Sequence, residues 1–486
     1  LVRYRIVGTR PDGTRVWADS DPETGEPGRF AYLVDRDGVP AWLREAVIYH
    51  VFVDRFAPAP GRGWSGTTAL DGFWGGTLAG LADRLDDLAS LGVTCLWLSP
   101  VFPSPSHHGY DATDYHTVEP RLGTVDDLSR LVAAAHARGM RVLLDFVANH
   151  VSSQHPAFLR AREDPASPER AWFTFRADGS YRAFFDVPSM PQVNVDHDAA
   201  ADYLIDAACA WLERGVDGFR LDYANGPSHA FWSRFRQAAR RVRPDCALIG
   251  EVVESAETMA SYLGRLDGVL DFLLLQQLRA FVGFDLIDAE AFWRFVSRHL
   301  AWFPEELALP SFLDNHDMNR FLWIARGDRR RLMLAALVQF ALPHPPIIYY
   351  GTEVGLSQWR DLEHPDGSRR MEESRTPMPW GEEQDTGLRR FYADLVAWRR
   401  QTRPWQARPD AAVAGPGGAL ALRLPGALVA INREPAPRTV PLDTAAAWSI
   451  RLATDPDVAI AQGALRLPPM AGAIVEAGDG AAGHGA

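Results

Sequence analysis

Short apolar runs alternate with amphipathic stretches along most of the chain. Between about residues 46 and 400, runs rich in β-branched residues are separated by segments with helical periodicity, such as Leu128–Arg138, Ala199–Arg214 and His229–Arg241. This alternation is typical of parallel strands joined by crossover helices. The predicted strands are Val47–Val53, Val93–Leu98, Arg141–Val147, Val216–Asp222, Ala247–Glu251, Gly268–Phe272, Pro310–Asp314 and Ile347–Tyr350.

Eight strand and helix units predict an α/β protein built on a (β/α)₈ barrel, which we expect over residues 42–149 and 199–403. Their spacing is even except after the third strand, where about 70 residues intervene, more than a crossover needs. We therefore expect an inserted, β-rich subdomain over residues 150–198. Aromatic residues in this segment flank Asp178-Gly179, a pair that favours a tight hairpin.

The two ends of the chain have a different pattern. Short alternating runs such as Ala419–Leu424 and Leu428–Asn432 predict an antiparallel β domain over residues 404–476, followed by a flexible tail at 477–486. Residues 1–41, with strand-like runs around Asp12-Gly13, predict a partial N-terminal β module. The most apolar stretch, Leu332–Leu342, is far shorter than the roughly 20 residues that cross a bilayer and predicts a core helix.

Composition narrows the classes of function. The chain has 486 residues, of which 47% are hydrophobic and 23% charged, and its formal net charge is -12. This apolar fraction excludes wholesale disorder, and the acidic balance argues against nucleic-acid binding. We expect no membrane partner.

Three scattered cysteines, Cys95, Cys209 and Cys246, suit neither a disulfide framework nor a zinc site. No apolar signal segment is visible, and the compartment is left undecided, with the cytoplasm favoured over secretion.

Charged side chains follow the predicted strands at the barrel end where active sites lie. Arg220 and Asp222 are two residues apart in the fourth strand, so they share a face. We expect Arg220 to keep Asp222 ionised and to lower its pKa, which suits a nucleophile. Glu251 follows an apolar strand, so burial should raise its pKa, which suits a general acid.

An ionised carboxylate beside a protonated one is what cleavage of a glycosidic bond requires. His316 and Asp317 follow the seventh strand, and Asp145, Asn149 and His150 follow or end the third. A single acidic residue at a strand end is most often a cap or a surface group. Four strands that end in polar clusters at matching depth instead indicate an active site.

Four of these clusters also match known motifs in order. The chain resembles the α-amylase family, glycoside hydrolase family 13, over roughly residues 42–475. The matching segments are Asp145-Phe-Val-Ala-Asn149-His150, Gly218-Phe-Arg220-Leu-Asp222, Gly250-Glu251-Val and Asn315-His316-Asp317.

The resemblance implies a role for each matching position. It implies Asp222 as nucleophile, Glu251 as acid/base, and Asp317 as a carboxylate that grips sugar hydroxyls. The substrate-binding residues that it implies around the cleaved bond are Tyr110, Asp111, His150, Arg220, His316 and Arg375.

Within the family, Met190-Pro191-Gln192-Val193-Asn194 resembles the signature of neopullulanases, cyclomaltodextrinases and nearby intermediate groups. The chain departs from those groups at Val252-Val253-Glu254, where they usually carry Trp-His, and its N-terminal module is shorter. Both differences weaken the transfer of the dimeric assembly and the cyclodextrin preference of those groups to this chain. A homodimer is still one expected assembly.

A calcium ion is not expected, although many α-amylases bind one between the barrel and the insert. Asn149 matches one ligand position, but the position four residues after Asp222, often a histidine ligand, is Gly226. The loop after Asp54-Arg55-Phe56 lacks the clustered Asp and Asn that a hard cation prefers. We expect neither a cofactor nor a required metal ion.

The expected function is retaining cleavage of α-glucosidic bonds in maltooligosaccharides, starch, pullulan or cyclodextrins. A transglycosylase or isomerase of the same family, using the same covalent intermediate, is the alternative. A non-catalytic carbohydrate-binding or assembly protein is a remote third reading, since such chains typically lose one of the three carboxylates. The sequence does not distinguish α-1,4 from α-1,6 bonds, or endo from exo action.

Overall fold

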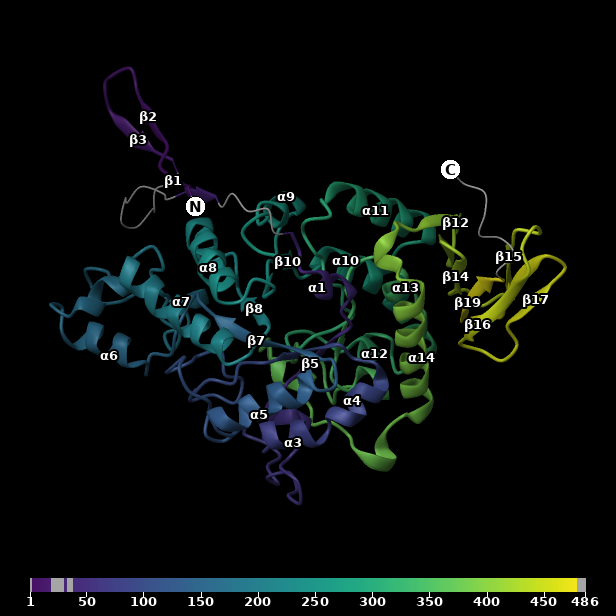
Figure 1. The fold of residues 1–486 in the computed structure, drawn as a ribbon, viewed down its shortest axis with the longest axis horizontal. Coiled ribbons are helices and arrows are strands. Elements are labelled where there is room, and N and C mark those ends of the chain that lie inside the picture. Colours follow the sequence, from purple (N-terminus) through teal and green to yellow (C-terminus); the bar gives the residue numbers. More distant parts are fainter. Residues whose placement is uncertain (1, 19–29, 33–37, 479–486) are drawn as a thin grey trace.

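The computed structural model describes residues 2–18, 30–32 and 38–478, and its largest sheet is parallel, with the order β10-β9-β8-β7-β6-β5-β11 (Figure 1). Its strands are β5 (Ile48–Val51), β6 (Cys95–Leu98), β7 (Arg141–Val147), β8 (Gly218–Asp222), β9 (Ala247–Gly250), β10 (Gly268–Val269) and β11 (Ile347–Tyr349). Each lies within a strand predicted from the sequence. The match is complete for β7, and most other strands begin later or end earlier than predicted.

The predicted seventh strand, Pro310–Asp314, closes the sheet between β10 and β11. Ala308 forms a parallel bridge with Gly268, and Ser311 forms one with Pro346. The segment makes isolated bridges instead of a continuous strand, in part because proline has no N–H to donate. The eight parallel segments thus complete the predicted (β/α)₈ barrel.

Helices pack around this barrel (Figure 1). The three predicted amphipathic segments form α5 (Val125–His136), α7 (Asp198–Glu213) and α8 (His229–Val242), and the predicted core helix is α13 (Arg329–Ala341). The other helices are α1 (Ala41–Glu45), α2 (Val53–Phe56), α3 (Leu78–Asp83), α4 (Leu85–Leu91), α6 (Pro156–Glu163), α9 (Ala256–Ala260), α10 (Phe272–Leu278), α11 (Ala289–Trp302), α12 (Phe321–Ile324) and α14 (Thr386–Thr402). In the described part of the chain, no helix is both long and apolar enough to span a membrane.

The insert over residues 150–198 contains less β structure than predicted. Its backbone pairs through isolated bridges, one of which joins Phe175 and Tyr181 across the predicted hairpin at Asp178-Gly179. Gly179 has a φ of 85°, which suits glycine in a tight turn. The insert also contains α6, which the aromatic pattern did not indicate. Pro156 at the first turn of α6 and His155, whose ring accepts the N–H of Ala157, begin this helix.

The C-terminal part forms two antiparallel sheets. The larger has the order β12-β13-β14-β19-β16 and the smaller β15-β18-β17. These strands are β12 (Asp410–Ala414), β13 (Ala419–Leu424), β14 (Ala427–Asn432), β15 (Arg438–Pro441), β16 (Trp448–Ala453), β17 (Ala459–Ala461), β18 (Ala464–Leu467) and β19 (Ala471–Ala477). The predicted flexible tail falls almost entirely outside the described residues, which end at 478.

The N-terminal part forms two short antiparallel pairs, β1 (Val2–Tyr4) with β4 (Phe30–Tyr32) and β2 (Val7–Thr9) with β3 (Arg15–Trp17). Asp12 and Gly13 lie in the turn between β2 and β3, as the sequence indicated, and Gly13 has a φ of 84°. The rest of the predicted module, at residues 1, 19–29 and 33–37, falls outside the described part.

Candidate active site

Charged side chains from three neighbouring strands meet at the carboxyl end of the barrel. Asp145 of β7 is the register partner of Arg220 in β8. Asp222 is the last residue of β8, and Glu251 comes directly after β9. Because residues two apart in a strand face the same way, Arg220 and Asp222 lie on one side of β8. The sequence analysis placed these groups correctly on adjacent strand ends.

Arg220 connects three carboxylates. Its Nη1 lies 2.8 Å from Oδ1 of Asp145 and 2.8 Å from Oδ1 of Asp222, and its Nη2 lies 2.7 Å from Oε1 of Glu251. The Arg220 side chain is buried. The backbone N–H of Tyr223 donates to the other oxygen of Glu251, Oε2, at 3.1 Å. The predicted pair of Arg220 and Asp222 is therefore part of a larger cluster that also fixes Glu251.

A second group of contacts joins Asp317 to this cluster. Nε2 of His316 lies 3.0 Å from Oδ2 of Asp317, and Nη2 of Arg375 donates to Oδ1 of Asp317 at 2.8 Å. Nε of Arg375 also donates to the backbone oxygen of His316 at 2.8 Å. The hydroxyl of Tyr110 lies 2.6 Å from Nε2 of His316 and donates to Oδ2 of Asp145 at 2.9 Å. Tyr110, His316, Asp317 and Arg375 thus belong to one continuous network.

His150 is buried at the junction of the barrel and the insert. Its ring stacks on Phe184 with a centroid distance of 4.4 Å, and its Nδ1 lies 3.3 Å from Nδ2 of Asn149. Burial lowers the pKa of His150 to about 3, so the ring is neutral near pH 7. Its buried Nε2 has no hydrogen-bond partner within the described residues.

Asp111 lies in the same loop as Tyr110 but makes different contacts. Its Oδ1 accepts hydrogen bonds from the hydroxyls of Ser104, at 2.7 Å, and Ser106. Nδ1 of His108 lies 3.9 Å from the same oxygen. In this structure the Asp111 carboxylate therefore orders the loop that carries Tyr110, and a contact with substrate stays a prediction.

Burial dominates the charge state of the carboxylates held by Arg220. It raises the pKa of Asp222 to about 7 and that of Asp145 to about 6, although the Arg220 guanidinium opposes both shifts. The expectation of a lowered pKa for Asp222 is therefore wrong, because one cation is shared among three buried carboxylates. Burial also raises the pKa of Glu251, as expected, and the neighbouring charge of Asp222 adds to the effect.

Asp317 has the opposite charge state. Its burial would raise the pKa, but the contacts with His316 and Arg375 outweigh burial and hold the pKa well below its usual value. Asp317 is therefore ionised, whereas the pKa values of Asp145, Asp222 and Glu251 are all raised by burial. A raised pKa at Glu251 suits a general acid.

Two residues beside this network were missed by the sequence analysis. Nε1 of Trp97 donates to Oδ2 of Asp145 at 3.1 Å, and the ring of His50 stacks on Trp97 with a centroid distance of 3.6 Å. His50 and Trp97 are register partners in β5 and β6, inside otherwise apolar strands. The signal in the sequence was that His50 and Trp97, two rings that carry polar nitrogen atoms, interrupt otherwise apolar predicted strands that are neighbours in the barrel.

At the calcium position suggested by the family, the Asn149 side chain already has a protein partner. Oδ1 of Asn149 accepts a hydrogen bond from Nε2 of Gln192 at 3.2 Å. Gly226 offers no side-chain ligand, and a Cβ there would lie only 2.1 Å from Oδ1 of Asn149. Calcium takes six to eight oxygen ligands. Across the residues that the structure describes, no group of three or more His, Cys, Asp or Glu side chains could hold a metal ion.

Comparisons with known proteins agree with this arrangement. The model of the alpha amylase catalytic domain matches residues 50–398. The chain is similar to alpha-amylase 2 of Dictyoglomus thermophilum, with 40% identity over 370 residues, and to neopullulanase 2 of Thermoactinomyces vulgaris, with 35% identity over 429 residues. These matches cover 76% and 82% of the chain but only 65% and 71% of the two relatives.

The fold is similar to that of the cyclic alpha-maltosyl-(1→6)-maltose hydrolase from Arthrobacter globiformis. The TM-score is 0.79 at 28% sequence identity, over 90% of this chain and 99% of that one. The same hydrolase has been solved in complex with maltose. Since the catalytic-domain model covers most of the chain and the four strand-end motifs meet in one network, the chain belongs to the alpha-amylase family.

Proposed function

We propose that this protein hydrolyses α-glucosidic bonds in maltooligosaccharides, starch, pullulan or cyclodextrins with retention of configuration. In this proposal Glu251 protonates the leaving oxygen while Asp222 attacks the anomeric carbon. Water then resolves the glycosyl-enzyme, with Glu251 acting as base. Asp317 binds sugar hydroxyls as the ring distorts, and Arg375 holds its carboxylate in place at 2.8 Å.

The contact of one guanidinium with both carboxylates carries this proposal. Asp222 and Glu251 contact the two terminal nitrogens of Arg220 at 2.8 Å and 2.7 Å. Retaining enzymes place their two carboxyl groups roughly 5–5.5 Å apart, whereas inverting enzymes leave about 6.5–9.5 Å for a water molecule. Sharing one guanidinium supports the shorter separation. The neutral ring of His150, whose buried Nε2 has no hydrogen-bond partner among the residues that the structure describes, suits a donor to a sugar hydroxyl.

Product stereochemistry tests this function. Hydrolysis of maltotriose followed by proton NMR should show the α-anomer first, before mutarotation, and initial β-anomer would contradict the proposal. Asp222→Asn should lower kcat by several orders of magnitude while sugar binding survives, because a nucleophile acts in the transition state.

Transfer to a sugar acceptor is the second candidate reaction. It uses the same glycosyl-enzyme, and Phe185, an aromatic residue 73% exposed and 5.4 Å from the ring of Tyr223, offers a surface for an acceptor sugar near Asp222. Product analysis across increasing maltotriose concentrations distinguishes the two. Longer or rearranged products would favour transfer, whereas shorter products alone favour hydrolysis.

We propose that activity needs no calcium ion. The Asn149 amide is already bonded to Gln192, and Gly226 provides no ligand. Dialysis against EDTA should leave kcat and the melting temperature unchanged, and restoration of lost activity by added calcium would contradict this.

The proposal extends to the partners. The expected ligand is an α-glucan, in line with the maltose complex of the structural relative. A homodimer is the proposed assembly, because the N-terminal part exposes Ile6, Val7 and Val16 to solvent. Analytical ultracentrifugation of the full chain, and of the variant Ile6→Asp with Val16→Asp, tests it. A monomeric parent would contradict the dimer.

A further inference from the structure

A cavity of about 800 Å³ lies beside the loops that follow the seventh and eighth strands of the barrel. Its volume falls in the range of roughly 300–1,000 Å³ that is usual for small-molecule sites. The lining combines aromatic rings with amide and carboxylate groups. The residues that matter here are Phe284, Asn319, Trp323, Gln358, Asp361 and Glu363.

This cavity is lined in part by the loop that carries Asp317, and its lining does not include the carboxylates of the active site. Asn319 lies two residues after Asp317, in the loop that follows the seventh strand. Nη2 of Arg369, from the loop after β11, donates to the backbone oxygen of Asp317 at 3.2 Å. Loops after barrel strands lie on the catalytic face. The cavity and the active site therefore lie on the same face of the barrel.

Two rings provide the apolar part of the lining. Phe284 is 48% exposed, and Trp323 of α12 is half-buried. Nε1 of Trp323 donates to Oδ2 of Asp361 at 3.3 Å. This bond fixes the plane of the indole, so the ring is a pre-oriented surface for an apolar sugar face.

Planar polar groups surround these rings. Oδ1 of Asp361 accepts from Nδ2 of Asn319 at 3.1 Å, and Nε2 of Gln358 donates to Oδ1 of Asn319. Within the described part of the chain, the carboxylate of Glu363 and the guanidinium of Arg326 make no hydrogen bond or ion pair. Both are thus available to the hydroxyls of a neutral ligand.

We propose that this cavity is a second, non-catalytic binding site for an α-glucan chain. The inference rests on the proposed function, which supplies the substrate class. The oriented indole of Trp323 and the exposed ring of Phe284 provide an apolar surface, and the unbonded side chains of Glu363 and Arg326 can bond hydroxyls, a combination that suits a neutral polyol. The two carboxylates of the lining, Asp361 and Glu363, disfavour an anion.

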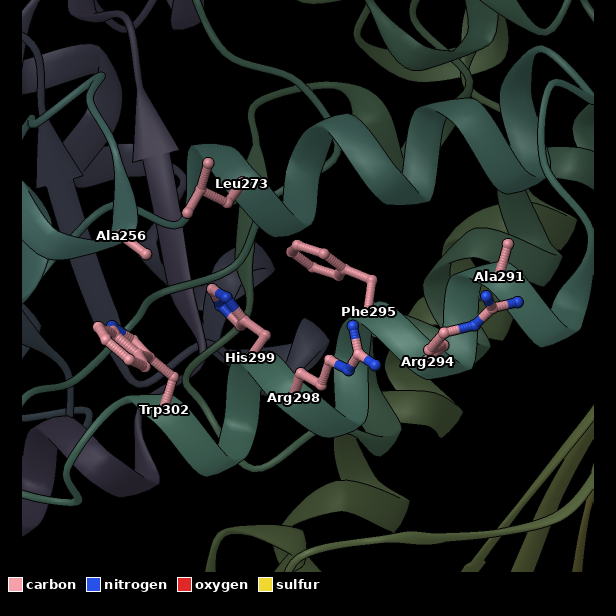
Figure 2. Close-up of a pocket in the computed structure, with 8 residues that line it drawn as sticks. All are labelled: Ala256, Leu273, Ala291, Arg294, Phe295, Arg298, His299 and Trp302. Atoms are coloured by element: carbon pink, nitrogen blue, oxygen red, sulfur yellow. The ribbon is translucent and has the colours of Figure 1, made fainter.

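A groove on the outside of the barrel provides a contrast (Figure 2). It has a volume of about 460 Å³ and runs along α11 beside Leu273. Figure 2 shows Phe295 and Trp302 with Arg294 and Arg298 on this helix, with no carboxylate among the labelled residues. Trp302 is 56% exposed. Trp302→Ala is therefore a matched control for removal of an exposed tryptophan.

The test compares a long and a short substrate. Trp323→Ala and Phe284→Ala should each lower kcat/KM on amylose by about threefold or more, the loss expected for one ring contact. The same variants should leave kcat/KM on maltotriose unchanged. Trp323→Phe, which keeps a ring, should retain most of the amylose activity, and Trp302→Ala should behave as the parent on both substrates.

Binding is measured separately from turnover. In gels containing amylopectin, Asp222→Asn should be retarded, and adding Trp323→Ala or Phe284→Ala should reduce the retardation, with folding checked by circular dichroism. Unchanged retardation and an unchanged ratio of amylose to maltotriose activity in both ring variants would overturn the second site. If the unsubstituted protein is retarded in the gel but inactive on maltotriose, the proposed function is contradicted and the second binding site is not.

Discussion

Asp145 and Arg220 are register partners on neighbouring strands, and Nη1 of Arg220 lies 2.8 Å from Oδ1 of Asp145. Trp97 and Tyr110 donate to the other oxygen of Asp145, so its carboxylate is held from two sides. Asp145 thereby fixes the guanidinium that contacts Asp222 and Glu251. Asp145, which takes part in no proposed chemical step, thus positions both Asp222 and Glu251, which do.

Replacement of Asp145 should shift the pH dependence of the reaction. The charge of Asp145 raises the pKa of Asp222 and competes for Arg220. In Asp145→Asn, the pKa of Asp222 should fall from about 7, so the acid limb of kcat/KM should move to lower pH by about one unit. The profile on maltotriose measures this shift.

Asp217 supplies the matched control for this shift. It is also buried and accepts the N–H of Val142 at 2.8 Å, but it precedes β8 at the opposite end of the barrel. Asp217→Asn should lower stability and leave the acid limb in place. An unmoved limb in Asp145→Asn, or an equal shift in both variants, would contradict the positioning role.

Removal of the shared cation should make stability depend on pH. In Arg220→Gln, the buried Asp145, Asp222 and Glu251 lose their counter-charge, so their folded-state pKa values rise further above the unfolded ones. Such groups stabilise the fold below the unfolded pKa and lose that contribution as pH rises through the folded pKa. The variant should therefore be destabilised by about 3–5 kcal/mol near pH 8 and by clearly less near pH 5.

Urea unfolding of Arg220→Gln and the parent at both pH values gives this comparison. Arg243→Gln, which removes a half-buried arginine paired with Asp217 at 2.6 Å, is the control for loss of a cation elsewhere. An equal loss of stability at pH 5 and pH 8 in Arg220→Gln would show that its carboxylates keep ordinary pKa values.

The acid role of Glu251 predicts a dependence on the leaving group. Glu251→Gln cannot donate a proton, so kcat/KM on maltotriose should fall by several orders of magnitude. The kcat/KM on α-maltosyl fluoride, which reports formation of the glycosyl-enzyme, should fall far less, because fluoride leaves without a proton. Measurement of kcat/KM on both substrates gives the contrast, and Asp222→Asn should be slow on both. Equal losses on the two substrates in Glu251→Gln would exclude this role.

Close packing at Gly226 gives a prediction about stability. A Cβ there would lie 2.1 Å from Oδ1 of Asn149, so Gly226→Ala must displace this amide and its bond to Gln192. We expect a loss of about 1–3 kcal/mol, typical of overpacking, with a lower kcat because His150 adjoins Asn149. Thermal unfolding checks it against Gly415→Ala, where a Cβ meets open space.

Much of this structure follows from local patterns in the sequence. Arg141–Val147 is apolar apart from Arg141 and Asp145, and its length and flanks fit a buried parallel strand, which the structure confirms. Pro310–Asp314 occupies the predicted place but makes only isolated bridges, which depend on neighbours that sequence periodicity does not specify. The helix at Pro156–Glu163 was missed because the aromatic spacing downstream favoured strands.

In the active site, too, the sequence pattern predicts contacts within one strand but not contacts between strands. The period of two along β8 suffices to pair Arg220 with Asp222. It cannot show that Asp145 and Glu251 share that guanidinium, or that burial outweighs the pairing and raises the pKa of Asp222 to about 7. These effects depend on distances across three strands, so they required the structure.

The central claim is that Asp222 forms a covalent bond to the sugar while Glu251 supplies and removes the proton. Intact-mass and peptide mass spectrometry of the enzyme treated with a 5-fluoro-α-glucosyl fluoride tests it most directly, because slow deglycosylation lets the adduct accumulate. We predict one added glycosyl group on the peptide that carries Asp222, and none in Asp222→Asn. A label on another residue, or turnover of the reagent with no adduct at any time, would contradict the account.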